Sequence, residues 1–160
     1  MNTAYILTGG NLGNRQQNLQ TAAMVIEEQC GDIIALSALY ETAAWGYTEQ
    51  PDFLNQVLVL QTQLQPEQLM SELLQIEEKM GRVRTVKFGP RIIDIDILLF
   101  NQLIIKSELL TLPHPALHER RFALTPLQEV APQLPHPVLH KTISQLLHEC
   151  HDTSNVQKIS

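Results

Sequence analysis

The feature that most restricts the fold of this chain is the order in which its hydrophobic periodicities follow one another. Two segments repeat apolar residues at helical spacing, and the runs around them alternate or are continuously apolar, as strands are. The predicted elements are a strand at Ala4–Thr8, a helix at Gln16–Gln29, strands at Ile33–Tyr40 and Phe53–Leu64, a helix from Pro66 to Gly81, and a strand through Asp94 and Asp96. This order is that of a ferredoxin-like βαββαβ core. It predicts an α+β fold in which helices pack on an antiparallel sheet.

The last third of the chain, residues 101–160, adds smaller elements to this core. It is rich in proline and histidine and shows a short helical pattern at Ile143–Cys150. No linker, repeat or low-complexity tract interrupts the sequence, and 160 residues are enough to bury a substantial core. We therefore expect one domain over residues 1–160, with a decorated C-terminal third.

Composition and charge exclude several classes of function. The chain is 44% hydrophobic and 18% charged, as globular proteins are, and its net charge of −6 argues against binding nucleic acid through its overall field. Cys30 and Cys150 lie far apart, so a reducing compartment is the simpler interpretation and one disulfide is the alternative. The sequence shows no signal peptide and no apolar run near the roughly 20 residues of a spanning helix. We expect a cytoplasmic monomer without nucleic-acid or membrane partners.

Positive charge gathers immediately before two aspartates. Five of the 11 lysines and arginines fall between residues 79 and 91, although such a cluster alone is as typical of a solvated loop as of a binding site. In a strand, Asp94 and Asp96 point to one face about 6.5–7 Å apart. That spacing suits Mg²⁺ ions whose remaining ligands are water and phosphate oxygens. A DxD pair alone, however, is more often the solvated face of an edge strand.

The residues around the aspartates favour a cleft over a solvated face. Strict alternation places Leu98 and Phe100 on the aspartate face, while the opposite face carries Ile93, Ile95, Ile97 and Leu99. A strand that is apolar on both faces is covered on both, so the aspartates are expected at the mouth of a cleft. Arg91 falls on the opposite alternation unless the chain twists or bulges there. Carboxylates that hold a metal beside a basic loop are what a nucleotide phosphotransferase needs.

Three further segments contain candidate binding residues. GGNLGNR matches neither a Walker A loop nor GxGxxG, and a tight turn with a helix start explains it at least as well as a phosphate cradle. TAAWG places the only tryptophan, Trp45, in a loop near Phe53 and Asn55, where it would suit a flat ring, although a lone tryptophan is more typical of a core. His114 and His118 have the i,i+4 spacing of zinc ligands, but the glutamate of HExxH is absent.

Together, these segments resemble one enzyme family. FGPRIIDIDILLF resembles the signature of the 6-hydroxymethyl-7,8-dihydropterin pyrophosphokinases of folate biosynthesis. Four further blocks resemble that family in the same order: YILTGGNLGNRQQNL, YETAAWGYTEQPDFLN, IEEKMGRVR and LPHPALHERRFALTPLQEVAP. The resemblance runs from about Tyr5 to Leu147. It implies transfer of pyrophosphate from ATP to 6-hydroxymethyl-7,8-dihydropterin, which gives the pterin diphosphate and AMP, with Mg²⁺ as cofactor.

The resemblance also implies roles for individual residues. Asp94 and Asp96 would hold two Mg²⁺ ions and, with Arg82 and Arg91, form the catalytic set. The implied ATP-binding residues are Glu77, Arg82, Arg84, Lys87, Arg91, Ile97, Thr111 and His114. The implied pterin-binding residues are Thr42, Ala43, Ala44, Trp45, Phe53, Asn55, Arg120 and Phe122. Phe53 and Phe122 would stack on opposite faces of the ring, and Asn55 would bond its pyrimidine edge.

The chain departs from some family members near the nucleotide. Lys87 and Phe88 stand where some members carry arginine and tryptophan, and Leu74, Leu109 and Pro115 replace a glutamine, an arginine and a tyrosine. These departures affect individual ATP contacts rather than the reaction. The basic loop that contains Arg84 and Lys87 is expected to close over both substrates and exclude water.

Two other classes of function are alternatives. A regulatory module on a ferredoxin-like fold would bind a small molecule without chemistry, and an ordinary kinase or phosphohydrolase would use the same metal site. The nucleotide product separates the three. AMP formed only with pterin indicates the pyrophosphokinase, ADP indicates the kinase or phosphohydrolase, and no turnover indicates the binding module.

Overall fold

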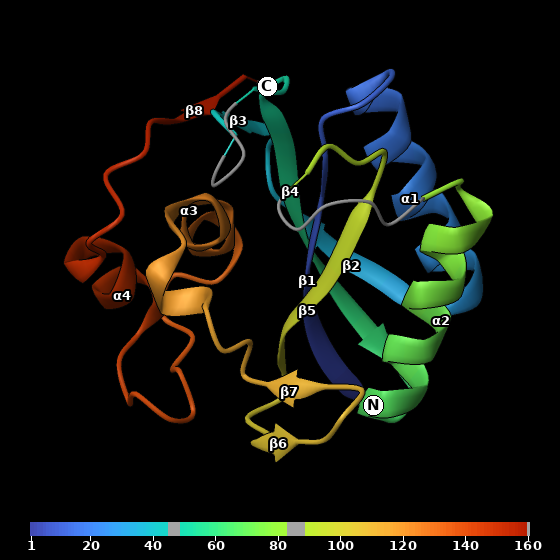
Figure 1. Ribbon diagram of the computed structural model, residues 1–160. Coiled ribbons are helices and arrows are strands. Elements are labelled where there is room, and N and C mark those ends of the chain that lie inside the picture. Colours follow the sequence, from blue (N-terminus) through green and yellow to red (C-terminus); the bar gives the residue numbers. More distant parts are fainter. Residues whose placement is uncertain (45–48, 83–88, 160) are drawn as a thin grey trace.

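The computed structural model describes residues 1–44, 49–82 and 89–159, which form an antiparallel sheet with helices on both faces (Figure 1). The strands are β1 (Asn2–Gly10), β2 (Asp32–Leu36), β3 (Tyr40–Thr42), β4 (Phe53–Thr62), β5 (Asp94–Phe100), β6 (Ile105–Lys106), β7 (Thr111–Leu112) and β8 (Val156–Lys158). The helices are α1 (Arg15–Gln29), α2 (Pro66–Lys79), α3 (Arg121–Val130) and α4 (Ile143–Glu149), with a 3₁₀ turn at Leu117–Glu119. Over these ranges, no helix combines the length and the apolar character that crossing a membrane requires.

The main sheet has the order β5-β1-β4-β3-β8, and β2 also pairs with β4. Its named strand pairs are all antiparallel, and the long pairing of β1 with β4 forms the centre. Strands β6 and β7 make a separate two-stranded sheet. The predicted α+β fold with helices on an antiparallel sheet is confirmed, and the element order is compatible with the predicted ferredoxin-like core.

The predicted strand at Ile33–Tyr40 is two strands, β2 and β3, separated by a polar break. At the break, Ser37 bonds β4 in both directions, since its amide donates to the Val57 carbonyl (2.9 Å) and its Oγ accepts from the Val57 amide (2.9 Å). The next amide, of Ala38, donates to the Glu129 carboxylate of α3 (3.0 Å). Side-chain acceptors therefore replace the regular ladder here, which an apolar pattern does not reveal.

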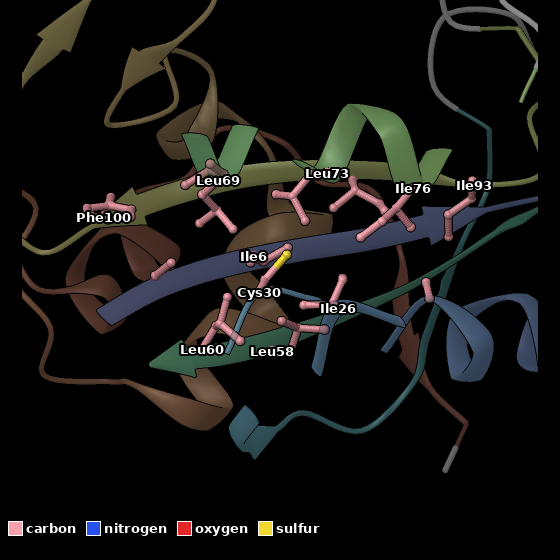
Figure 2. Packing of buried hydrophobic residues seen from close by; sticks show 14 of the residues in the cluster. Ile6, Ile26, Cys30, Leu58, Leu60, Leu69, Leu73, Ile76, Ile93 and Phe100 are labelled. Carbon is pink, nitrogen blue, oxygen red and sulfur yellow. The ribbon is translucent and has the colours of Figure 1, made fainter. Parts of the chain in front are cut away.

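Two hydrophobic clusters cover the two faces of the sheet. One lies between the sheet and helices α1 and α2, where Leu69, Leu73 and Ile76 of α2 meet Ile6 and Ile26 (Figure 2). The other lies beneath α3 and α4 and contains Leu7, Val57, Leu98, Leu99, Leu117, Ala123, Leu124, Leu127, Ile143 and Leu146. A fully buried aliphatic side chain contributes about 1.5–3 kcal/mol, so both layers are needed for stability. Below, these sides are called the α1/α2 face and the α3 face.

The predicted alternation along β5 is wrong beyond Leu98, because the strand contains a β-bulge. Ile6 of β1 pairs with Ile97 and Tyr5 pairs with Leu99, which leaves Leu98 as the extra residue. Leu98 and Leu99 consequently both join the cluster on the α3 face, and Phe100 returns to the α1/α2 face. Phe100 therefore does not continue the aspartate face, and Leu99 does not lie opposite it. The expectation that both faces of this strand are covered holds.

The turn after β1 approaches the chain before β5 so closely that only glycine fits. A Cβ on Gly10 would lie 2.2 Å from the carbonyl oxygen of Ile92 and 2.9 Å from its carbonyl carbon. In the same place the amides of Asn11 and Leu12 donate to the carbonyl of Arg91, at 2.9 and 3.2 Å. The β1 turn and the residues that precede β5 are thus held together by backbone contacts.

Gly10→Ala is expected to destabilise the protein by about 2 kcal/mol or more, because the added methyl group meets backbone atoms that cannot move independently. Gly9→Ala is the matched comparison: its nearest neighbour is the Oδ1 atom of the Asn55 side chain, 2.1 Å away, which can rotate aside. Urea unfolding of both variants measures the difference. A Gly10→Ala protein within about 0.5 kcal/mol of wild type would contradict the close approach.

Candidate active site

Residues from three adjacent strands form one row on the α3 face of the sheet. Gly9 of β1 pairs with Asn55 of β4 on one side and with Asp94 of β5 on the other. Two residues earlier on β1, Leu7 pairs with Asp96, and Leu7 belongs to the cluster beneath α3. Directly paired residues share a face of the sheet, so Asn55, Asp94 and Asp96 all point toward α3.

Gly9 leaves this row open at its centre. The side chain of Asn55 is 5% exposed and lies across β1, with Oδ1 in the space that a Cβ on residue 9 would fill. The orientation of the Asn55 amide therefore depends on glycine at position 9. The GGNLG segment is a turn that leads into a helix, because Asn14 caps α1 by accepting from the Gln17 amide (3.1 Å).

Asp94 is held by two arginines from different segments. Its Oδ1 accepts from Nη1 of Arg82 at 2.6 Å, and its Oδ2 accepts from Nη1 of Arg91 at 3.2 Å. Arg82 also donates to the carbonyl of Ile93 (3.2 Å), which fixes the guanidinium beside the start of β5. The strand begins at Asp94, so strict alternation does not apply to Arg91, and its side chain turns back to the aspartate. The structure thus brings together Arg82, Arg91 and Asp94.

Arg91 is anchored through both its backbone and its side chain. Nε and Nη2 donate to the carbonyl of Gly89, at 3.0 and 2.8 Å, and the guanidinium lies 5.0 Å from the ring centroid of Phe53. The amide of Arg91 donates to Oδ1 of Asn11 (2.9 Å), which is 2% exposed. Asn11 was not among the sequence candidates. The feature of the sequence that could have indicated this role is its residue type, because an asparagine in a turn often forms hydrogen bonds with the backbone.

Asp96 lies half-buried on the same strand as Asp94. Burial raises its pKa to about 7, together with the charges of Asp94 and Glu77, against the attraction of Arg120 and Arg82. Glu77 of α2, 3% exposed, accepts from the amide of Ile95 at 2.7 Å. Because β5 is an edge strand, this bond occupies the edge and fixes the backbone between the two aspartates.

The paired carboxylates fit a hard divalent cation that receives its other ligands from a substrate or from water. Asp94 and Asp96 offer acceptor oxygens on one face, and the carboxylate of Asp96 is costly to ionise without a nearby cation. In the described ranges, no group of three histidine, cysteine, aspartate or glutamate residues is placed to hold a metal ion by itself. Mg²⁺ is the ion that needs only one or two protein carboxylates.

His114 is neutral and has a fixed tautomer. Burial lowers its pKa to about 4, with a further contribution from Arg120 and against the attraction of Asp94. Nδ1 accepts from the amide of Ala116 at 3.2 Å, so the proton lies on Nε2. The backbone amide of His114 donates to the carbonyl of Leu98, next to the bulge of β5 (2.9 Å). The residue can therefore offer a neutral N–H donor near Arg120 and Asp94.

The predicted pterin residues come from β3, β4 and the start of α3. Thr42 pairs with Phe53, and its buried Oγ1 has no hydrogen-bond partner among the described residues. Arg120 lies with its guanidinium carbon 5.7 Å from the ring centroid of Phe122, and α3 packs against β3 and β4. A buried hydroxyl that lacks a partner among the residues described and is paired across the sheet with Phe53 is a suitable place for a polar, flat ligand.

The remaining candidates are placed as follows. Ile97 is 2% exposed and packs in the core on the α1/α2 face, so its side chain does not join the aspartates. Thr111 lies in β7, and Ala43 and Ala44 directly follow β3. Trp45, Arg84 and Lys87 lie outside the described residues, as does the closure predicted for the basic loop.

Comparison with known proteins agrees with this geometry. The family model for 7,8-dihydro-6-hydroxymethylpterin-pyrophosphokinase (HPPK) matches residues 5–132. The 2-amino-4-hydroxy-6-hydroxymethyldihydropteridine pyrophosphokinase of Aquifex aeolicus is 39% identical over 145 residues, which cover 91% of this chain and 90% of that protein. The enzyme of the same name from Bacillus subtilis is 41% identical over 134 residues, which cover 83% of this chain and 80% of that protein.

Some relatives are much longer than this chain. The folic acid synthesis protein FOL1 of Dictyostelium discoideum is 40% identical over 99% of this chain, which spans about a quarter of that protein (24%). Among solved structures, wild-type HPPK-DHPS of Plasmodium falciparum with SDX-DHP superposes with a TM-score of 0.76 at 21% identity, covering 93% of this chain and 43% of the other. That likeness shows a shared fold. The resemblance seen in the five sequence blocks is confirmed, and the chain belongs to the 7,8-dihydro-6-hydroxymethylpterin-pyrophosphokinase family.

Proposed function

We propose that this protein transfers pyrophosphate from ATP to the hydroxymethyl group of 6-hydroxymethyl-7,8-dihydropterin, which releases AMP and the pterin diphosphate for folate biosynthesis. The observation that carries the proposal is the row on the α3 face, in which Asp94, paired with Arg82 and Arg91, lies one strand from Gly9 and two from Asn55. The proposed phosphate-binding group, Asp94 with its arginines, and the proposed ring-binding residue Asn55 therefore lie on the same surface. The names of the relatives support the same reaction.

The carboxylate end of the row is the proposed ATP site. Asp94 and Asp96 are the metal ligands, and two bound Mg²⁺ ions would neutralise the triphosphate and polarise its phosphoryl oxygens. Arg82 and Arg91 bind phosphate oxygens, and Asp94 orients both guanidinium groups before ATP arrives. The remaining proposed ATP-binding residues are Glu77, Arg84, Lys87, Ile97, Thr111 and His114. His114 contributes its neutral Nε2–H donor, and Glu77 orients β5 from behind.

The other end of the row is the proposed pterin site. The amide of Asn55 both donates and accepts, as the pyrimidine edge of a pterin requires, and the Thr42 hydroxyl has hydrogen bonds to offer. The rings of Phe53 and Phe122 supply apolar faces, each with an arginine beside it. The other proposed pterin contacts are Ala43, Ala44, Trp45 and Arg120. Arg91 reaches both ends, because it touches Asp94 and Phe53.

The nucleotide product tests the proposed function. The protein is incubated with ATP and Mg²⁺, with and without 6-hydroxymethyl-7,8-dihydropterin, and the nucleotides are separated by ion-exchange chromatography. AMP that forms only in the presence of the pterin, in equal amount to the pterin diphosphate, is expected. ADP would identify an ordinary kinase or phosphohydrolase, and the absence of turnover would identify a binding module.

Asp94→Asn and Asp96→Asn are each expected to lower kcat by at least about 10²-fold, because a neutral amide of the same shape is a poor ligand for Mg²⁺ and does not balance the arginines. Asp32→Asn, at an exposed aspartate on β2, is the control and should behave as wild type. Circular dichroism verifies that all three proteins are folded. Wild-type turnover by either active-site variant would exclude these aspartates as metal ligands.

Gly9→Ala is expected to raise the KM for the pterin by roughly tenfold, with a smaller change in the KM for ATP. The methyl group would displace the Asn55 amide, whose Oδ1 occupies its position, and a lost or misplaced hydrogen bond costs about 1–2 kcal/mol. Initial-rate kinetics with each substrate varied in turn measure the effect. An equal rise in both KM values would mean that Gly9 shapes the site as a whole rather than Asn55 alone.

The low pKa of His114 predicts how stability depends on pH. Its pKa falls from 6.5 to about 4 on folding, so protonation favours the unfolded chain. The contribution of neutral His114 is complete above pH 6.5 and is lost as the pH falls toward 4. His114→Asn keeps an acceptor for the Ala116 amide but does not titrate. Wild type should therefore lose about 1–3 kcal/mol more than this variant between pH 7 and pH 4.5 in urea unfolding.

The exposed His148, changed to asparagine, is the control for that measurement. This variant should lose stability with falling pH as wild type does, because a solvated side chain loses little of its hydration on folding. Parallel curves for wild type and His114→Asn would show that His114 is not held neutral by the fold.

A further inference from the structure

The C-terminal segment beyond α4 returns to the sheet and bonds to two separate elements (Figure 1). At its start, Oδ2 of Asp152 accepts from the amide of Arg121, the first residue of α3 (3.1 Å). Oδ1 of Asp152 accepts from the amide of Ser154 (2.9 Å) and from its hydroxyl. The segment then forms β8, which pairs antiparallel with β3. One short stretch of chain therefore connects α3 to β3.

Asp152 supplies a hydrogen-bond acceptor that the start of α3 lacks locally. The first amides of a helix need acceptors from outside the helix, and the residue at the cap position, Arg120, has only donors in its side chain. A carboxylate at this end also interacts favourably with the helix dipole. Burial opposes ionisation of Asp152, but the bonds from Ser154 and Arg121 outweigh it and lower its pKa. Arg120 and Phe122, both proposed pterin residues, flank the amide that Asp152 accepts.

Strand β8 supports β3 on the side that β4 does not occupy. β3 is only three residues long, and β8 pairs with its whole length, from Tyr40–Lys158 to Thr42–Val156. The amide of Ile159 adds a bond to the carbonyl of Leu39 (2.9 Å). A three-residue strand with a partner on one side only is weakly held, because it makes few backbone hydrogen bonds and each contributes little net stability. Thr42, whose buried hydroxyl has no hydrogen-bond partner in the described part of the chain, is the last residue of this strand.

The opposite end of α3 is attached to the same region of the sheet. The carboxylate of Glu129 accepts from the hydroxyl of Tyr40 in β3 (2.6 Å) and from the amide of Ala38 (3.0 Å). The C-terminal half of α3 therefore has its own connection to β3. Its N-terminal half, which carries Phe122, is connected through Asp152.

We propose that the segment from Asp152 to Lys158 is a positioning element for the pterin half of the active site, which holds Arg120 and Phe122, at the start of α3, at a fixed place relative to Thr42 on β3. The segment touches neither substrate, and its effect is on geometry. This inference rests on the proposed function, because it takes Thr42, Arg120 and Phe122 as pterin contacts. Asp94 lies across the sheet on β5, and the arginines that hold it, Arg82 and Arg91, precede that strand, so we expect the ATP half to depend less on the segment.

The test is steady-state kinetics of Asp152→Ala with each substrate varied in turn, together with equilibrium binding of the pterin. We expect the KM and Kd for the pterin to rise about tenfold, with the KM for ATP changed less than about threefold, since loss of the helix cap weakens the start of α3 and also frees the segment. Asp152→Asn keeps an acceptor at the cap and should recover most of the pterin affinity. Glu149→Ala breaks the exposed pair with Lys141 and is the control, with kinetics as wild type.

A second variant ends the chain after His151 and so removes Asp152 and β8 together. Assayed below its unfolding temperature, it should show a larger rise in the KM for the pterin than Asp152→Ala, again with little change for ATP. Hydrogen exchange should show faster exchange at the first amides of α3 in both variants. Faster exchange with unchanged pterin affinity would overturn the proposal, because the cap would then be structural only.

An equal rise in both KM values would also overturn it. These results differ from failure of the proposed function, which would appear in the wild-type protein as absence of pterin-dependent AMP. If wild type neither turned over nor bound the pterin, the proposed function and this inference would both fall.

Discussion

The candidate site depends on how Arg91 is held, because this residue connects three parts of the chain. Its backbone bonds to Asn11 in the turn after β1, and its guanidinium reaches Asp94 on β5 and the ring of Phe53 on β4. Gly10 makes the approach of the turn possible, since any side chain there would enter the backbone at Ile92. The position of Arg91 beside Asp94 is therefore fixed by backbone contacts as well as by its side chain.

The register of the sheet explains why two chemically different groups meet on one surface. Adjacent strands lie about 4.8 Å apart, so Asn55 and Asp94, separated by β1, have backbones about 10 Å apart. Gly9 lies between them and presents no side chain toward α3. A substrate can then lie across β1 and contact both groups at once. A side chain at this position would divide the surface into two separate sites.

The sequence predicts the parts of this arrangement that depend on local periodicity and residue type. The four main strands and two helices, the shared face of Asp94 and Asp96, and the charge before them follow from alternation and composition. The wrong face predicted for Phe100, in contrast, comes from a contact between strands that local periodicity does not show. The bulge at Leu98 is set by how β5 fits β1 and α3, and neither strand alone contains a signal for it. The break between β2 and β3 is similar, since it depends on Glu129, which lies far away in sequence.

The sequence does not reveal the contacts in which a side chain of one segment accepts a hydrogen bond from a backbone amide of a distant segment. Asn11, Glu77 and Asp152 each satisfy a backbone amide of another segment, at Arg91, Ile95 and Arg121. A buried amide must find an acceptor, but the requirement does not specify which residue provides it. Asn11 and Asp152 look like ordinary loop residues when only the sequence is read, and the bond from the Ile95 amide to Glu77 is not part of the role that the sequence implied for Glu77. In this fold these three side chains lie directly behind the residues proposed to meet the substrates, so the chemistry depends on a second layer of contacts that periodicity cannot detect.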